Sequence, residues 1–243
     1  MKKFYEWGIF SIFPKHCAYC DALIPGNEFA CADCKKNLPR ITGEICKRCG
    51  RNKSDCTCKG SSNYYKSIAA PFYFEDNVRK GIHKFKFSNL KGNSKAYAYE
   101  MSKTVNERFK GVKFDYITEV PMSKKSMNAR GYNQSSLLCK RISELTDINY
   151  EPQILKKIYE TDKQHGLNRI LRKGNLTGVY DSDFPEKIEG KTILLCDDIS
   201  TSGETLNECS KMLWLYGAKE IYCITAALTK MRGDKNVRNK YRN

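Results

Sequence analysis

Eight cysteines near the start of the chain have the type and spacing of metal ligands. They form four close pairs, and a tight turn that carries such a pair aims two thiolates at one ion. Four thiolates complete the closed tetrahedral site of structural zinc, so the spacing predicts two structural Zn2+ sites. The predicted ligands are Cys17, Cys20, Cys31, Cys34, Cys46, Cys49, Cys56 and Cys58. The simplest pairing takes the first four for one ion and the last four for the other, and a cross-braced pairing stays open.

A secreted disulfide framework is the first alternative for a stretch so rich in cysteine. It would need a signal peptide, and Glu6 interrupts the apolar run between Met1 and Pro14, with no small-residue cleavage site before the first cysteine pair. No segment approaches the roughly 20 apolar residues of a membrane span. We therefore expect a cytoplasmic protein whose cysteines hold metal.

A second group of residues that could bind a ligand lies between Lys191 and Thr205. A buried apolar run ends in two carboxylates, Asp197 and Asp198, and a loop of small hydroxylated residues follows. Loop amides and the N-terminus of a helix present donors to a phosphate, and Gly203 lets the backbone approach it closely. Two adjacent carboxylates suit the vicinal hydroxyls of a ribose. The segment thus predicts a site for a ribose 5-phosphate group.

The remaining pattern indicates the elements that must position this site. Beyond residue 60, apolar strand-like runs alternate with helical patterns, as in an α/β fold with a mostly parallel sheet between flanking helices. The strands include Tyr116–Val120 and the run that ends at Cys196, and helices are expected at Val78–Phe87 and Ser135–Leu145. We expect a small zinc module at 1–60 and a larger domain at 61–243.

The segment from Lys191 to Thr205 resembles the phosphoribosyl-pyrophosphate (PRPP) motif of type I phosphoribosyltransferases. Neighbouring motifs resemble the ComF (competence protein F) family in particular, and together with the cysteine pairs they cover nearly the whole chain. These motifs are Val120-Pro121, Ala129-Arg130-Gly131-Tyr132-Asn133-Gln134, and then Gln164, Leu167, Arg172, Asn175 and Tyr180. The departures are small: Tyr132 and Tyr180 stand where Phe is more usual, Lys157 where Arg is common, and Ser200 and Ser202 where the motif commonly has other residues.

The resemblance implies a type I phosphoribosyltransferase-like domain after a double zinc ribbon, with PRPP and Mg2+ as ligands. The PRPP-binding segment would comprise Asp197, Asp198, Ser200, Thr201, Ser202, Gly203, Glu204 and Thr205. The pyrophosphate loop would comprise Pro121, Met122, Ser123, Lys124, Lys125 and Arg130. A flexible hood from Lys156 to Asn175 would bring Gln164, Arg169 or Arg172 over the ligand.

The resemblance also implies a role in natural transformation, handling incoming single-stranded DNA alongside competence helicase or recombination proteins. The alternative is a catalytic nucleobase or amido phosphoribosyltransferase of nucleotide metabolism. No residue pattern names the acceptor or a general base, so turnover stays open.

The charge of the chain bears on the DNA hypothesis. The formal net charge is +16, and two four-thiolate zinc sites would lower it to about +12. Most of the excess lies beyond residue 60. Between Asn77 and Tyr99 there are six basic residues and no acid, interleaved with Phe85, Phe87 and Tyr97, which suits a single strand. The plain alternative is a helix whose Val78, Ile82 and Phe85 are core and whose lysines are solvated.

Overall fold

A parallel sheet forms the centre of the molecule, a computed structural model that describes residues 15–26, 28–58, 62–88, 90–158 and 179–230. The strand order is β3 (Ser67–Ala69), β9 (Glu220–Leu228), β8 (Thr192–Ser200) and β5 (Tyr116–Glu119), and β4 (Phe72–Tyr73) also pairs with β9. All these pairings are parallel. The predicted mostly parallel α/β sheet is therefore confirmed.

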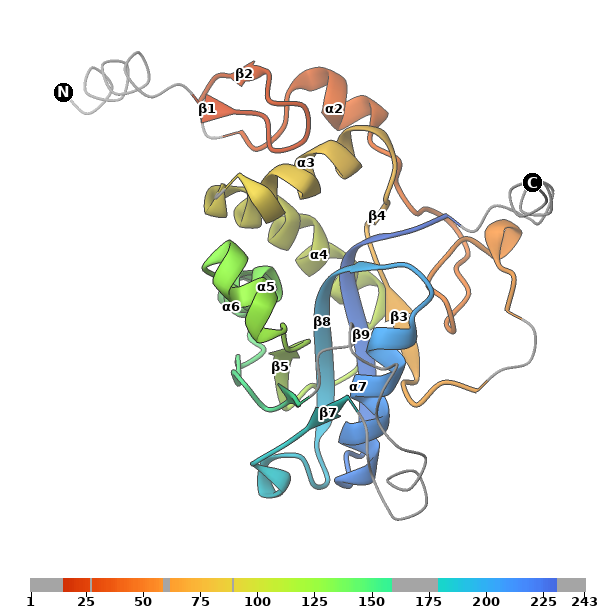
Figure 1. Cartoon of the computed structure of the whole chain (residues 1–243). Helices are drawn as coiled ribbons and strands as arrows, with labels where there is room; N and C mark the ends of the chain where they lie inside the picture. Colours follow the sequence, from red (N-terminus) through yellow and green to blue (C-terminus); the bar gives the residue numbers. More distant parts are fainter. Residues whose placement is uncertain (1–14, 27, 59–61, 89, 159–178, 231–243) are drawn as a thin grey trace, which may run out of the picture.

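The sheet is covered by helices on both faces (Figure 1). One face packs against α3 (Asp76–Phe87), α4 (Ser94–Arg108) and α6 (Gln134–Leu145), and the other packs against α7 (Glu204–Leu215). Since side chains alternate along a strand, β8 sends Leu194 and Cys196 to the first core and Ile193 and Leu195 to the second. Burial on both faces explains why β8 and β9 read as nearly continuous apolar runs.

Two strands differ from the boundaries that the sequence favours. The apolar run before residue 75 forms two short strands, because Pro71 interrupts it. β8 continues to Ser200 instead of ending at Cys196, because its pairing with β9 extends as far as Ser200 opposite Leu228. Asp197 and Asp198 thus lie inside the strand and not in the loop that follows it.

The cysteine-rich segment packs into the same core as the sheet. It contains the hairpin of β1 (Lys15–His16) and β2 (Leu23–Ile24), the short helix α2 (Ala32–Asn37) and a 3-10 turn, η1 (Lys53–Asp55). Tyr19 is fully buried, with its ring edge-on to Phe72 at 5.8 Å and to Tyr97 at 5.3 Å. At Gly81 of α3, a Cβ atom would lie 2.3 Å from the carbonyl oxygen of Ala18. Only glycine allows this close contact.

The remaining elements are short. They are the 3-10 turns η2 (Lys91–Asn93) and η4 (Pro185–Lys187), helix α5 (Lys124–Arg130), and the antiparallel pair of β6 (Lys156–Lys157) with β7 (Tyr180–Asp181). Among the described residues, no helix is both long and apolar enough to cross a membrane.

Candidate functional site

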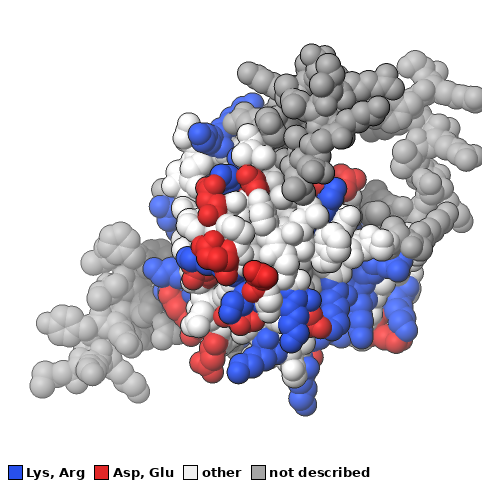
Figure 2. Space-filling model, turned by 90° about the horizontal axis from the view of Figure 1, so that it is seen from below, with Lys and Arg blue, Asp and Glu red and all other residues white. Residues whose placement is uncertain are grey.

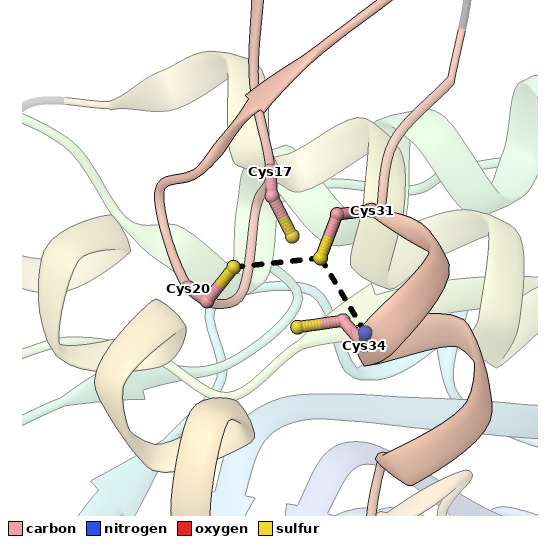
Figure 3. Close-up of side chains that lie close together, drawn as sticks. All are labelled: Cys17, Cys20, Cys31 and Cys34. Atoms are coloured by element: carbon pink, nitrogen blue, oxygen red, sulfur yellow. Dashed lines mark hydrogen bonds between the residues drawn. The ribbon is translucent and has the colours of Figure 1, made fainter.

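The first four cysteines converge on one point (Figure 3). Cys17 and Cys20 come from the hairpin turn, and Cys31 and Cys34 come from the start of α2. The Sγ atoms of Cys20 and Cys31 are 3.6 Å apart, and the backbone N–H of Cys34 lies 3.4 Å from Sγ of Cys31. Zn–S bonds of about 2.3 Å in a tetrahedron place sulfur atoms about 3.8 Å apart. The cluster therefore has the dimensions of a zinc site.

The second cluster consists of Cys46, Cys49, Cys56 and Cys58. In each cluster all four sulfur atoms lie within 4.8 Å of one another. The pairing is thus sequential, which decides the alternative that the spacing alone left open. The remaining four cysteines, Cys139, Cys196, Cys209 and Cys223, are buried in the two cores.

One thiol in each cluster is already disposed to lose its proton. Burial acts to raise the pKa of Cys17, but hydrogen bonds from the backbone at Cys20 and Cys31 outweigh it and lower that pKa to about 7. The pKa of Cys46 is likewise lowered to about 7, against the effect of burial, chiefly by the backbone at Cys49. Zinc binds thiolates, so backbone donors that stabilise the ionised sulfur favour metal binding.

The paired carboxylates of β8 lie at the carboxyl end of the sheet. Oδ1 of Asp197 accepts a hydrogen bond from Oγ of Ser135 at 3.0 Å and from the backbone N–H of Asp198 at 2.8 Å. Burial and the neighbouring charge of Asp198 raise the pKa of Asp197 to about 7. The two carboxylates can therefore accept hydrogen bonds, but ionising Asp197 costs free energy in the ligand-free protein.

Asp198 forms an ion pair that the sequence did not predict. Nζ of Lys86, from the last turn of α3, lies 2.8 Å from Oδ1 of Asp198, and both side chains are largely buried. The two residues are far apart in sequence, and Lys86 looks like one of several solvated lysines there. Packing of α3 on the sheet brings this cation to the acidic pair.

The loop after β8 leads into the N-terminus of α7 through Gly203. Gly203 has a φ of +87° and caps α7, and Oγ of Ser202 lies 3.4 Å from the backbone N–H of Glu204. A Cβ at Gly203 would contact the hydroxyl of Tyr65 at 3.4 Å. The loop and the second cysteine cluster together line a pocket of about 250 Å³, to which Ser202, Cys49 and Cys58 contribute. The loop amides and the helix N-terminus of this twelve-residue helix can bind an anion.

The predicted pyrophosphate loop lies beside the acidic pair. The backbone N–H of Val120 donates to the carbonyl of Cys196 at 2.9 Å, and Pro121 and Met122 follow at the same edge of the sheet. Ser123 caps α5, whose first residues, Lys124 and Lys125, are exposed. The guanidinium of Arg130 donates to Oε1 of Gln134 at 3.0 Å and lies 5.0 Å from the ring centre of Phe87.

Two family models match this chain. The double zinc ribbon domain matches residues 9–63, and the phosphoribosyl transferase domain matches residues 153–243. Competence protein F of Haemophilus influenzae is 28% identical over 220 residues, which cover 79% of this chain and 94% of that protein. The chain is a homologue of the ComF proteins. Competence protein ComFC of Bacillus subtilis is 26% identical over 201 residues, covering 79% and 80% of the two chains.

A further relative is DNA utilization protein YhgH of Escherichia coli, which is 25% identical over 228 residues and covers 92% of each chain. The double zinc ribbon followed by a phosphoribosyltransferase domain is therefore confirmed. The matched ribbon includes both four-cysteine clusters, and the matched phosphoribosyltransferase domain includes β8, the loop after it and α7.

Three predicted site residues of this ComF homologue, Gln164, Arg169 and Arg172, lie outside the described residues. Of the predicted hood, Lys156–Asn175, the structure describes the first three residues, which include β6, and β6 pairs with β7 beyond the hood. Sequence reasoning missed three residues of the site, Lys86, Ser135 and Arg51, of which Arg51 donates a hydrogen bond to the carbonyl of Thr201. Each contacts a residue more than 30 positions away, so no local motif signals it.

Proposed function

We propose that this protein binds PRPP with Mg2+ at the carboxyl edge of β5 and β8. The observation that carries the proposal is the convergence, at one edge of a parallel sheet, of the Asp197–Asp198 pair, the loop Thr201–Thr205 and the loop that begins at Pro121. Ligands of open α/β sheets bind at this edge. The homologous proteins support the same fold and a competence-related family.

Each part of this edge suits one part of PRPP. The carboxylates accept hydrogen bonds from the ribose hydroxyls, and the amides of the loop after β8 donate to the 5-phosphate. The loop from Pro121 and the cations of α5 face the pyrophosphate. Mg2+, when bound, neutralises pyrophosphate oxygens and keeps several waters. Lys86 stabilises the charge of Asp198 and keeps that carboxylate oriented while it accepts.

The double variant Asp197→Asn with Asp198→Asn tests this assignment. Each substitution keeps the shape of the side chain but replaces a charged acceptor, so we expect PRPP affinity in the presence of Mg2+ to fall at least a hundredfold. Isothermal calorimetry measures it, and Asp147→Asn, at an exposed position, is the control. Unchanged binding by the double variant contradicts the proposal. Pyrophosphate release in the same samples, with each nucleobase added, separates turnover from binding.

We further propose that single-stranded DNA contacts the exposed side of α3. Phe85 is buried in the core, as the plain alternative predicted, and Tyr97, a second aromatic expected at such a surface, is buried as well. Phe87 is 67% exposed. Its ring lies 6.0 Å from that of His83, which in turn lies 6.0 Å from that of Phe74. This aromatic row ends beside Arg130 and next to Lys86, at the proposed PRPP site.

Guanidinium groups lie at both ends of the aromatic row. Arg79 lies 6.0 Å from the ring centre of Phe74, and Arg130 lies 5.0 Å from that of Phe87. In single-stranded DNA, bases stack on aromatic rings and phosphates pair with cations. The aromatic row and its two guanidinium groups offer both kinds of contact. Seen from below, Lys and Arg side chains gather along one side of the surface, with some acidic side chains among them (Figure 2).

Phe87→Ala is expected to weaken binding of a single-stranded oligonucleotide about tenfold, because base stacking on one aromatic ring contributes about 1–3 kcal/mol. Phe184→Ala is the matched control, since Phe184 is also exposed and has the cation of Lys187 5.0 Å from its ring centre. Fluorescence anisotropy measures both at several salt concentrations. Affinity that does not fall with salt, or an equal effect of the two substitutions, contradicts a site on α3.

A further inference from the structure

The second zinc ribbon is attached directly to the sheet that carries the phosphate loop. Gly50, in the turn between Cys49 and Arg51, has a φ of +70°, and a Cβ there would lie 2.8 Å from Leu228 and 3.0 Å from the carbonyl oxygen of Ile68. The backbone N–H of Ile68 donates to the carbonyl of Lys47 at 3.0 Å. The ribbon turn therefore lies against β3 and β9 without room for a side chain.

Arg51 reaches from this turn to the phosphate loop. Its side chain is only 4% exposed, and its guanidinium donates to the carbonyl oxygens of Thr201 at 2.6 Å and Thr229 at 2.7 Å. The backbone N–H of Thr229 in turn donates to the carbonyl of Ser200 at 3.0 Å. A charged donor forms stronger hydrogen bonds than a neutral one, so Arg51 restrains Thr201 directly and Ser200 through Thr229.

The contact with Thr201 has a geometric consequence for the loop. In a planar trans peptide the C=O of one residue and the N–H of the next point in opposite directions, and no cis peptide is present among the described residues. Because Arg51 holds the carbonyl of Thr201 toward the ribbon, the N–H of Ser202 points away from the ribbon. This is the first amide of the cradle that the proposed 5-phosphate site uses.

We propose that Arg51 is a positioning residue for the phosphate loop, and that the second zinc ribbon thereby sets the affinity of the site for the 5-phosphate of its ligand. The inference rests on the proposed function for its choice of ligand, although the contact itself does not. Arg51 stands between the zinc ligands Cys49 and Cys56, so zinc in the second cluster holds the turn that presents the guanidinium. The pyrophosphate loop has no described contact with Arg51.

The test compares Arg51→Met and Arg51→Lys with Arg40→Met in the full-length protein. Arg40 joins the ribbon region to α4 through two hydrogen bonds to Glu100, at 2.7 and 3.1 Å, and makes none to the phosphate loop. Calorimetry measures affinity for ribose 5-phosphate and, separately, for pyrophosphate with Mg2+. Spectra of protein labelled with 15N-glycine follow the amide of Gly203 without any ligand. Zinc content is measured for every variant.

For Arg51→Met we expect affinity for ribose 5-phosphate to fall about tenfold or more, affinity for pyrophosphate to stay within twofold, and the Gly203 signal to shift. Arg51→Lys retains one charged donor, so its affinity for ribose 5-phosphate should lie between those of wild type and Arg51→Met. If Arg51→Met loses zinc, the Lys variant tests the role of Arg51 in its place. Arg40→Met should change neither affinity. An unchanged Gly203 signal, or an equal loss for both ligands, overturns the proposal. If wild-type protein binds neither ligand, the proposed function fails, and the Gly203 signal alone then decides the role of Arg51.

Discussion

Removal of zinc by a strong chelator is expected to unfold residues 15–58 and to destabilise the helices packed against them. Structural zinc sites bind with about 10–16 kcal/mol of apparent free energy, which in small modules is folding free energy. This segment has little regular secondary structure besides α2 and the hairpin of β1 and β2, whose strands have two residues each. Its Tyr19 nevertheless fills the core between Phe72 and Tyr97. Loss of zinc from the first site should therefore also destabilise α4 and β4, which carry Tyr97 and Phe72.

Metal analysis and thermal unfolding measure this effect together. The purified protein should contain about two Zn2+ per chain, as eight thiolates in two clusters require. Cys34→Ala should retain about one and lose much of its stability. Cys139→Ala, which alters a buried cysteine outside both clusters, should retain two. A chelator that extracts all zinc without lowering the melting temperature would contradict a structural role for the metal.

Asp197→Asn is expected to stabilise the ligand-free protein above about pH 7 while it removes PRPP binding. The pKa of an unfolded Asp is about 3.9, and in the folded protein burial and the charge of Asp198 raise that of Asp197 to about 7. Below about pH 4 the carboxyl is protonated in both states, so it carries no penalty. Between these values only the unfolded state ionises, and folding stability falls as pH rises. Above about pH 7 the penalty is constant.

Asparagine escapes this penalty and still accepts the hydrogen bonds from Ser135 and from the backbone of Asp198. The stability difference between the variant and wild type should grow from near zero at pH 4 to on the order of 2–4 kcal/mol at pH 8. Urea unfolding at several pH values measures it, with Asp147→Asn as the exposed control. A difference that does not change with pH would show that Asp197 titrates normally.

The ionisation cost at Asp197 agrees with a site built for ligand rather than for stability. Two carboxylates at adjacent positions repel each other, and only Lys86 offsets their charge in the described part of the chain. A ligand with ribose hydroxyls supplies donors to both. Binding should therefore favour the ionised pair and stabilise the fold. Without ligand, the cost of ionising Asp197 lowers the stability of the fold, as is common for residues kept for function.

Local spacing was enough to predict the double zinc ribbon and the phosphoribosyltransferase-like fold of this protein. The eight cysteines, the acidic pair and the loop to Thr205 are short motifs whose residues act together because they are neighbours in sequence. The same holds for the alternation of strands and helices, since β8, β9 and α7 are long and strongly apolar on their core sides. The zinc ribbon, the sheet and its helices follow from these patterns.

Tertiary structure decided which distant residues complete the sites. Sequential zinc pairing, the ion pair of Lys86 with Asp198 and the contact of Arg51 with Thr201 join segments that approach only when the chain is folded. Packing of α3 also gave two phenylalanines different surroundings. Phe85 lies in the core and Phe87 at the surface, because they point to opposite sides of the helix. Spacing identifies groups that act within one segment, whereas contacts across the core depend on how helices and ribbons pack on the sheet.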